Sequence, residues 1–401
     1  MTAAGNALQE LLSELLSEPD ELMVERTATA YDRYAGACPR QVVIFGAGQL
    51  GRFVLPGVRA AGLQPLAFCD NNPRSWGNQI EGVTVLSTQA AVERYGGRAC
   101  FLLAIYNASP VVRQLRELGC TAIVPYPAFS WKYGQYLADE RLALPYRILE
   151  QAEEIERAYE LLSDDRSREE FCTQIRWRCL LDYGCLPNPD APQDMYYPQD
   201  LFRLTPDEVF VDCGAFDGDS IRSFIQKVDG RFRHIYAFEP DEANIRALAS
   251  YTATLPAEVA KKITVLPYAV GRENGKVRFA AEGSVGSKVV ADGGTVELEC
   301  RSLDSALGAV SPSLIKMDIE GGEIHAIPGG ADTIARSSPV MAVCAYHRCN
   351  DLWVLPGLLK EANPDYEIFL RRYAEECWET VYYAVPPECL YAQPGEDGAL
   401  P

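Results

Sequence analysis

The chain has 401 residues, of which 48% are hydrophobic and 23% charged, enough for two to three globular domains with their own cores. Its formal net charge of −19 argues against binding to nucleic acids or anionic membranes, because both are bound mainly through Lys and Arg. The 13 cysteines are scattered without a C-x-x-C pair, which predicts reduced thiols in a cytoplasmic protein and no zinc site.

The N-terminal segment lacks the basic and apolar regions of a signal peptide. Its leucines recur at helical spacing, at Leu8, Leu11, Leu12, Leu15 and Leu16. This pattern predicts an amphipathic helix that packs on its own domain or on a second copy of the chain, and a homodimer is one hypothesis. No apolar run approaches the ~20 residues of a membrane span, so we expect none.

Residues 41–126 alternate short apolar runs with helical stretches, which predicts a parallel sheet with helices on its faces. Gly46, Gly48 and Gly51 form G-x-G-x-x-G after the first strand, and Asp70 ends the next strand about 20 residues later. No acid lies in this turn, so the helix N-terminus could receive a phosphate while Asp70 binds a ribose. A scaffold without a ligand is the other interpretation.

The segment FCDNNPRSWGNQIEGVTVL resembles the Rossmann-like domain of sugar-nucleotide-modifying proteins in polysaccharide pathways. The resemblance implies a nucleotide or sugar nucleotide as ligand of this domain. Nothing around the glycines indicates a hydride-transfer site. A nucleotide-sugar binding or oxidoreductase module is therefore the alternative function for the chain.

Residues 131–186 contain few glycines and many Leu, Glu and Arg, which predicts two or three helices. From residue 207 the strand-like runs return, KVRFAA and TVELECRSL among them, and predict a mostly parallel sheet that ends in a β-hairpin. We expect an α/β protein with two Rossmann-like parallel-sheet domains joined by a helical segment. The predicted divisions are 1–130, 131–200 and 201–401.

A second glycine-rich turn, VFVDCGAFDGDS at 209–220, carries Asp212, Asp217 and Asp219. Carboxylates stabilise a helix start but would repel a pyrophosphate a few ångströms away. The turn therefore predicts a ligand with positive charge and no phosphate, and S-adenosylmethionine fits because it carries a sulfonium and an ammonium. Glu239 ends the next strand and could accept both ribose hydroxyls.

Four motifs in this region, VFVDCGAFDGDS, YAFEPDEAN, LPYAVG and LIKMDIEGGEIHAIPGG, resemble those of the FkbM-type S-adenosylmethionine-dependent methyltransferases. The resemblance implies a class I methyltransferase fold and an O-methyltransferase acting on a hydroxyl of a sugar, glycan or related natural product. It also implies that the loop at 283–287 closes over the site. The residues that it assigns to cofactor binding are Asp212, Gly214, Phe216, Asp217, Gly218, Glu239, Pro240, Asp241, Asn244, Ala269 and Asp318.

The strand LIKMDIE predicts where the methyl group goes. Alternation places Lys316, Asp318 and Glu320 on one face. Charges within a central parallel strand are costly unless they are paired or lie at its open end, so Lys316 is predicted to pair with an acid such as Asp212. Asp318 and Glu320 are then expected to face the methyl group.

His347 ends the neighbouring strand and is predicted to lie beside Asp318. We predict His347, Asp318 and Glu320 as the catalytic residues, with His347 as general base or as a residue that orients the acceptor. The two carboxylates and the histidine could hold a divalent metal, but the ligand set is incomplete and no metal site is predicted. A methyltransferase fold used only for assembly is opposed by the intact acids.

Overall fold

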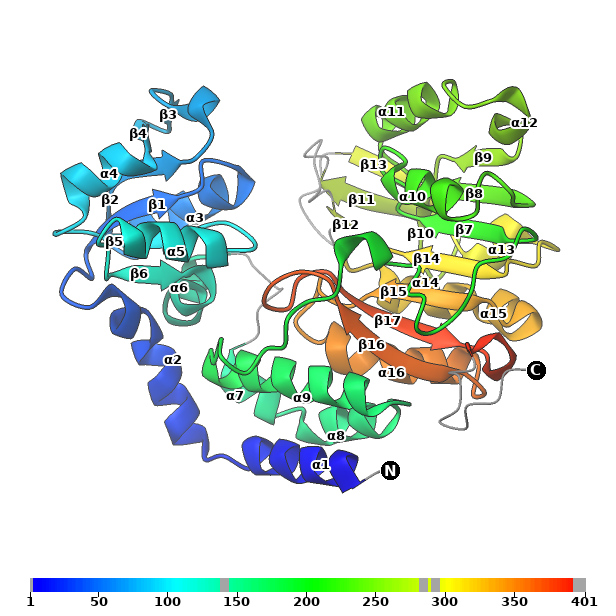
Figure 1. The fold of residues 1–401 in the computed structure, drawn as a ribbon, viewed down its shortest axis with the longest axis horizontal. Coiled ribbons are helices and arrows are strands. Elements are labelled where there is room, and N and C mark those ends of the chain that lie inside the picture. The colour runs from blue at the N-terminus through cyan, green and yellow to red at the C-terminus, as the bar shows by residue number, and fades with distance from the viewer. Residues whose placement is uncertain (1–2, 138–143, 281–287, 290–295, 392–401) are drawn as a thin grey trace, which may run out of the picture.

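The computed structural model describes residues 3–137, 144–280, 288–289 and 296–391. It contains two α/β units connected by a group of helices (Figure 1). This arrangement confirms the predicted fold class of two sheets rich in parallel strands. Within the described ranges, no helix is long and apolar enough to cross a bilayer.

The first unit has a six-stranded sheet in the order β3-β4-β2-β1-β5-β6. Every neighbouring pair is parallel except β3 and β4. The strands are β1 (Gln41–Phe45), β2 (Gln64–Asp70), β3 (Gln79–Ile80), β4 (Val83–Ser87), β5 (Cys100–Leu103) and β6 (Ile123–Pro125). The helical elements are α3 (Gln49–Ala60), η1 (Pro73–Ser75), α4 (Thr88–Tyr95), α5 (Ser109–Glu117), α6 (Tyr126–Tyr133) and η2 (Gly134–Tyr136).

Strand β1 is apolar on both faces because helices cover both sides of this sheet. Val42 and Ile44 lie in one core cluster with residues of α3 and α6, while Val43 and Phe45 lie in another with residues of α4 and α5. The continuous apolar run in the sequence therefore corresponds to a central, doubly covered strand.

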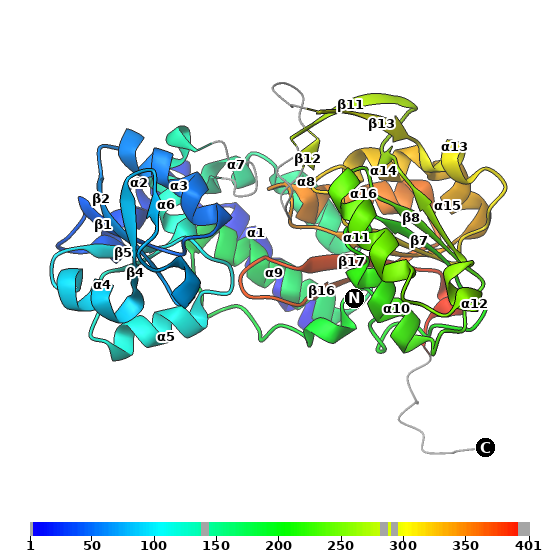
Figure 2. The ribbon, with the colours of Figure 1, turned by 90° about the horizontal axis from the view of Figure 1, so that it is seen from above.

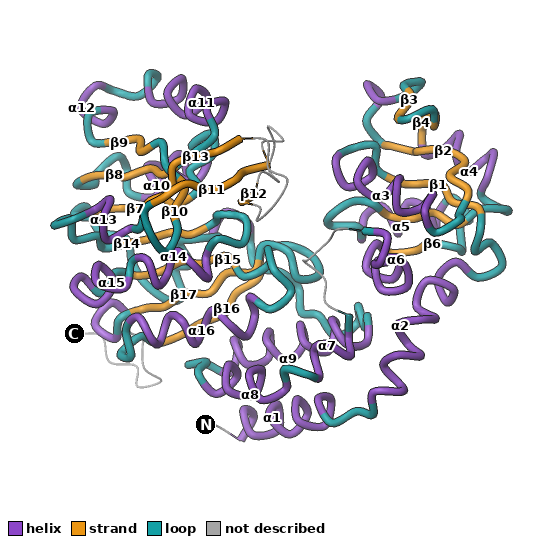
Figure 3. Tube along the Cα trace, turned by 180° about the vertical axis from the view of Figure 1, so that it is seen from behind, coloured by secondary structure: helices purple, strands orange, loops and turns teal. Residues whose placement is uncertain are grey.

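The helical group consists of α1 (Ala3–Leu16), α2 (Asp20–Ala35), α7 (Pro145–Leu149), α8 (Ala152–Glu160) and α9 (Asp165–Leu180). The predicted N-terminal amphipathic helix is α1, and it packs against α8 and α9. Leu12 and Leu16 are buried in a core shared with the second sheet. Figure 3 shows α2 running from these helices to the first sheet. The N-terminal helix thus packs on the helical group, not on the first sheet.

The second unit has a seven-stranded sheet in the order β16-β17-β15-β14-β7-β8-β9. Its strands are parallel except where β17 meets β15 and β16. The predicted parallel sheet with a terminal hairpin is therefore present. The strands are β7 (Val209–Cys213), β8 (His234–Phe238), β9 (Ile263–Leu266), β14 (Leu314–Met317), β15 (Val340–Cys344), β16 (Glu367–Arg372) and β17 (Thr380–Val385).

Helices cover both faces of this second sheet. Residues of α14, α15, α16, α8 and α9 pack on one face, and residues of α10 and α11 pack on the other. The helical elements of this part of the chain are η3 (Pro192–Asp194), α10 (Asp219–Lys227), α11 (Glu242–Thr252), α12 (Ala257–Ala260), α13 (Leu303–Leu307), α14 (Glu323–Gly329), α15 (Ala331–Ser337), α16 (Asp351–Ala362) and η4 (Pro387–Cys389).

Two of the predicted strands lie outside the main sheet. KVRFAA and TVELECRSL supply β11 (Gly275–Ala280) and β13 (Val296–Arg301), which pair antiparallel in a separate four-stranded sheet with β10 (Ala269–Val270) and β12 (Lys288–Val289). No described helix lies between β11 and β13, and antiparallel neighbours need no helical crossover. The expectation that these runs join the parallel sheet was wrong.

The carboxyl edges of the two main sheets meet through the β16–β17 turn (Figure 2). The backbone N–H of Glu375 in this turn donates to Asn107 Oδ1 at 2.9 Å, and Glu375 Oε2 accepts from the N–H of Ser109 at 2.8 Å. The rings of Tyr106 and Trp378 make an edge contact with centroids 4.7 Å apart. The loop after β5 therefore lies against the hairpin that borders the end of β15. The predicted division at residues 130 and 200 remains a prediction.

Candidate functional site

The glycine turn after β7 packs directly on the backbone that follows β14. Gly214 has φ +84°, and a Cβ atom there would lie 1.9 Å from the carbonyl oxygen of Asp318. Gly218 has φ +89° and precedes α10. Only glycine fits both the conformation and the close approach at Gly214, so the sequence at this turn brings Asp318 next to it.

Glu239, at the end of β8, braces this turn. Its Oε2 accepts from the N–H of Phe216 at 2.9 Å, and its Oε1 accepts from the N–H of Asp241 at 2.9 Å and from Asn244 Nδ2 at 3.2 Å. Burial raises the pKa of Glu239, although these donors favour the charged form. The carboxylate of Glu239 therefore stabilises the turn, and the predicted hydrogen bonds from a ribose would use its remaining lone pairs.

Asp212 and Lys316 form the buried ion pair that strand alternation predicts. They are register partners on β7 and β14, and Lys316 Nζ lies 3.0 Å from Asp212 Oδ1. Lys316 also donates to the carbonyl of Gly214 at 2.7 Å, and Ser220 Oγ donates to Asp212 at 2.5 Å. Burial alone would lower the pKa of Lys316, but Asp212 and Asp318 raise it above its usual value. The ion pair therefore helps to hold the glycine turn after β7 against β14.

Several polar side chains contact the carboxylate of Asp318. Its Oδ2 accepts from the Tyr196 hydroxyl at 2.7 Å, and its Oδ1 lies 3.2 Å from His347 Nε2 and 3.5 Å from the Tyr346 hydroxyl. Burial would raise the pKa of Asp318, but the His347 N–H and the charge of Lys316 hold it below its usual range. Its side chain is 25% exposed, so the charged carboxylate is accessible from the carboxyl edge.

His347 lies between carboxylates on both sides of its ring. Nδ1 is 3.0 Å from Glu323 Oε1, whereas Nε2 faces Asp318 Oδ1 and lies 3.9 Å from Glu320 Oε2. Burial would lower the pKa of His347, but Glu323 and Asp318 raise it well above its usual value. The structure therefore brings the three predicted catalytic residues together, and a charged ring favours an orienting residue over a general base.

Four side chains around Asp318 and His347 were not singled out from the sequence. Glu323 lies inside the motif LIKMDIEGGEIHAIPGG and Tyr346 directly precedes His347, so both could have been found from the sequence. Tyr196 lies in the segment before β7 and has a φ of +69°. Glu379 lies in the β16–β17 turn, and its Oε2 accepts from the Tyr346 hydroxyl at 3.3 Å. Neither carries a local signal, because only the tertiary fold brings them to Asp318.

The other predicted cofactor residues lie along the same edge. Pro240 and Asp241 follow β8, and Asp241 caps α11 by accepting from the N–H of Ala243 at 2.7 Å. Ala269 is buried in β10. Asp217 Oδ1 is buried without a hydrogen-bond partner among the described residues. Such an acceptor fits a ligand that brings an N–H donor. The predicted lid, residues 283–287, lies outside the described residues.

The N-terminal glycine turn is braced in a similar way. Asp70 Oδ2 accepts from the N–H of Ala47 at 2.8 Å, and Asp70 Oδ1 accepts from the N–H of Asn72 at 2.7 Å. A Cβ atom at Gly51 would lie 2.0 Å from the carbonyl oxygen of Gly46, whereas one at Gly48 would meet nothing within 4 Å. No side chain of the described residues caps the start of helix α3 at this turn, which leaves its first N–H groups available to a ligand.

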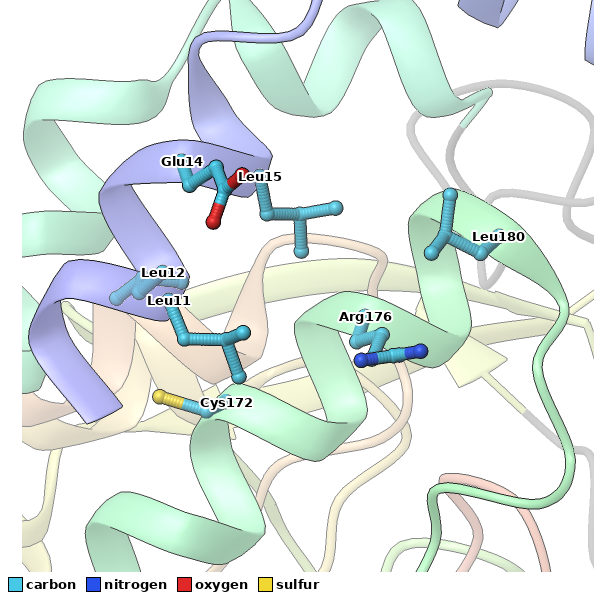
Figure 4. Close-up of a pocket in the computed structure, with 7 residues that line it drawn as sticks. All are labelled: Leu11, Leu12, Glu14, Leu15, Cys172, Arg176 and Leu180. Carbon is cyan, nitrogen blue, oxygen red and sulfur yellow. The ribbon is translucent and has the colours of Figure 1, made fainter. Parts of the chain in front are cut away.

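A pocket of 260 Å³ lies elsewhere, between α1 and α9 (Figure 4). None of the residues that line this pocket is a predicted catalytic or cofactor-binding residue. The residues that line it are Leu11, Leu12, Glu14, Leu15, Cys172, Arg176 and Leu180.

Residues 212–374 match the family model of the methyltransferase FkbM domain. The crystal structure of a methyltransferase FkbM from Methylobacillus flagellatus KT is 21% identical and aligns over 95% of this chain and 99% of that chain, with a TM-score of 0.73. The two proteins therefore share their fold across both units. No curated protein matches the sequence significantly.

Two further solved structures align with parts of the chain. A precorrin-6y C5,15-methyltransferase from Geobacter metallireducens GS-15 is 13% identical over 46% of this chain and 83% of its own, with a TM-score of 0.29. A UDP-D-quinovosamine 4-dehydrogenase from Vibrio fischeri is 20% identical over 20% of this chain and 73% of its own, with a TM-score of 0.18. These scores are too low to support an inference.

The family match covers the acid-rich glycine turn, Glu239, Asp318 and His347, the residues that the geometry gathers at one sheet edge. Residues 212–374 of this chain are therefore similar to the methyltransferase FkbM domain.

Proposed function

We propose that the protein transfers a methyl group from S-adenosylmethionine to a hydroxyl oxygen of a sugar, glycan or related natural product. The observation that carries this proposal is the position of Asp318. Its backbone packs against Gly214 in the acid-rich turn, while its carboxylate is oriented by Tyr196 and His347. A donor bound at the turn would thus lie next to a carboxylate held ready for an acceptor hydroxyl.

The acid-rich turn fits a cationic donor. Asp217 Oδ1 is a buried acceptor without a hydrogen-bond partner in the described part of the chain, which the ammonium group of S-adenosylmethionine would satisfy. In this proposal Glu239 binds the ribose and Asn244 approaches the adenosine, and the acids of the turn disfavour a dinucleotide. When bound, S-adenosylmethionine supplies a methyl group on a positively charged sulfur.

The residues of this chain have to place the acceptor oxygen in line with that methyl group, at about 3 Å. An acceptor hydroxyl held there would form its O–C bond as the C–S bond of the donor breaks, which would leave S-adenosylhomocysteine as the product. The hydroxyl proton passes to a carboxylate oxygen of Asp318 or Glu320. His347, held by Glu323 and Asp318, orients this group.

The test is release of S-adenosylhomocysteine by the full chain with a panel of nucleotide sugars and glycans, with mass spectrometry to locate the methyl group. Asp318→Asn should lower turnover by about 100-fold, because positioned proton transfer contributes about that much. Its affinity for S-adenosylmethionine should change much less. Glu258→Gln, at an exposed acid of α12, should match the wild type. Methylation of nitrogen alone, or full activity in Asp318→Asn, would contradict the proposal.

We also propose, as a second function, that the N-terminal turn binds the phosphate of a nucleotide-linked ligand. The supporting observation is that α3 starts uncapped at Gly48, on the sheet edge that lies against the β16–β17 turn. Gly48→Asp has room for its side chain and would cap α3 while repelling phosphate. We expect calorimetry with UDP-sugars or NADH to lose its signal in this variant, with thermal stability retained. No binding by the wild type would leave this domain as a scaffold.

A further inference from the structure

We propose that Asp318, Glu323 and His347 form a binding site for one divalent cation of the Mg²⁺ or Mn²⁺ class, beside the acid-rich turn. One ligand atom from each of these side chains lies within 4.8 Å of the other two. This spacing suits carboxylate oxygens and an imidazole nitrogen arranged around a common ion. No metal was predicted from the sequence, because Glu323 was not recognised as part of the group.

Glu323 supplies an independent observation. The residue is fully buried, and its Oε2 has no hydrogen-bond partner among the described residues. Its other oxygen already faces His347 Nδ1 at 3.0 Å. A buried carboxylate with one oxygen unsatisfied is costly, and buried charges are usually paired or coordinate metals. A cation among these side chains would satisfy that oxygen.

The charge balance around the histidine points the same way. Asp318, Glu320 and Glu323 all lie within 4 Å of His347 ring nitrogens, and one imidazolium cannot neutralise three carboxylates. Asp351 is also fully buried, and its Oδ1 has no hydrogen-bond partner in the described structure. Burial and the negative charge of Glu323 raise the pKa of Asp351.

Among the described residues, two further cations lie near the site, and each has a closer partner outside the ligand group. Lys316 is 3.0 Å from Asp212 but 4.0 Å from Asp318, and Arg348 Nε donates to the carbonyl of Gly321. The excess of negative charge at the site is therefore suited to a divalent ion.

The cation would take the position of the ring proton between His347 and a carboxylate. The part played by the cation in catalysis rests on the proposed methyl transfer: it would contact the acceptor oxygen and make the hydroxyl more acidic. The hydroxyl proton would still pass to a carboxylate oxygen of Asp318 or Glu320. Binding of the cation itself does not depend on that function.

The test is a titration of the full chain with Mn²⁺, followed by the loss of the free-ion signal in electron paramagnetic resonance. We expect one saturable site per chain. Asp318→Asn and Glu323→Gln should each weaken binding by at least about tenfold. Glu379→Gln is the matched control, because it removes an acid near the site but outside the ligand group, and it should change affinity by less than about threefold.

Thermal unfolding checks that each variant is folded. Asp318→Asn, at a partly exposed side chain, keeps the test open if Glu323→Gln is unstable. Calorimetry with S-adenosylmethionine on the same samples separates the two proposals. No saturable Mn²⁺ binding by the wild type, or equal affinity in Asp318→Asn and Glu379→Gln, overturns the cation site. If S-adenosylmethionine binds in either case, the proposed function stands without it.

Discussion

At the residue scale, Gly214 packs the acid-rich turn against the backbone of Asp318. Gly214→Ala combines a positive φ with a Cβ atom 1.9 Å from a backbone oxygen that has no freedom to move away. We expect a loss of more than about 2 kcal/mol in the free energy of unfolding. The control is Gly275→Ala, where the added Cβ meets nothing within 4 Å and the change should stay within about 1 kcal/mol. Equal urea midpoints for the two variants would rule out the close packing.

The Lys316–Asp212 pair provides a second residue-scale prediction. Lys316→Met leaves the fully buried Asp212 without its cation, so the free energy of unfolding should fall by about 3–5 kcal/mol. Adding Asp212→Asn should recover much of that loss, because the uncompensated charge is gone. Chemical denaturation measures both variants. In Lys261→Met, at the exposed pair with Glu258, the change should be below about 1 kcal/mol. If Lys316→Met were as stable as Lys261→Met, Lys316 and Asp212 would not form a charged pair.

Sequence reasoning reached some of these residues and missed others for a physical reason. Alternation along β14 was enough to predict the Lys316–Asp212 pair, since neighbouring parallel strands bring such positions together. Glu239 was found by its distance from the turn, but its bracing hydrogen bonds to Phe216 and Asn244 depend on loop geometry. Tyr196 comes from a distant segment, and its contact with Asp318 exists only in the folded chain.

At the element scale, the β16–β17 hairpin links the two units. Its turn contacts the loop after β5. The last residue of the turn is Glu379, and the Tyr346 hydroxyl lies within hydrogen-bonding distance of both Glu379 and Asp318. The hairpin itself was predicted from two closely spaced apolar runs. Its contact with the other unit was not, because turn residues such as Glu375 carry no periodic pattern.

Glu376 in this turn predicts a pH dependence of stability. Burial, mainly, raises its pKa from the ordinary 4.5 to about 7. Between these values the folded chain holds a proton that the unfolded chain releases, so this residue's contribution to stability falls as pH rises from about 4.5 to 7. Glu376→Gln should remove that fall. The melting temperature of Glu376→Gln minus that of the wild type should therefore be larger at pH 8 than at pH 5. If this difference in melting temperature did not change with pH, the raised pKa of Glu376 would be refuted.

The small sheet formed by β10 to β13 shows the limit of pattern reasoning for whole elements. The strands were recognised as strands, but their partners were assigned to the wrong sheet. The apolar runs are compatible with either sheet, and the antiparallel pairing of β11 with β13 is decided by long-range packing. The parallel strands were easier to place, because each follows a helix that returns the chain to the same sheet.

At the scale of the whole molecule, two sheet edges with different charge chemistry meet at one hairpin. The turn at Gly46–Gly51 has no acid, while the turn at Asp212–Asp219 has three. The fold of both units and the similarity of residues 212–374 to the methyltransferase FkbM domain follow from the structure and the comparisons. Cytoplasmic location and a homodimer remain predictions from composition and the N-terminal helix, and a monomer mass by light scattering would contradict the dimer.

The most direct test of the central claim is calorimetry of S-adenosylmethionine binding to the full chain. The acid-rich turn should give one saturable site. Glu239→Gln should weaken it by about tenfold or more, because a buried charged acceptor is lost. Glu258→Gln, at an exposed acid of α12 outside the turn, should bind like the wild type. If the wild type showed no heat with S-adenosylmethionine, or if Glu239→Gln bound it unchanged, the donor site described above would be wrong.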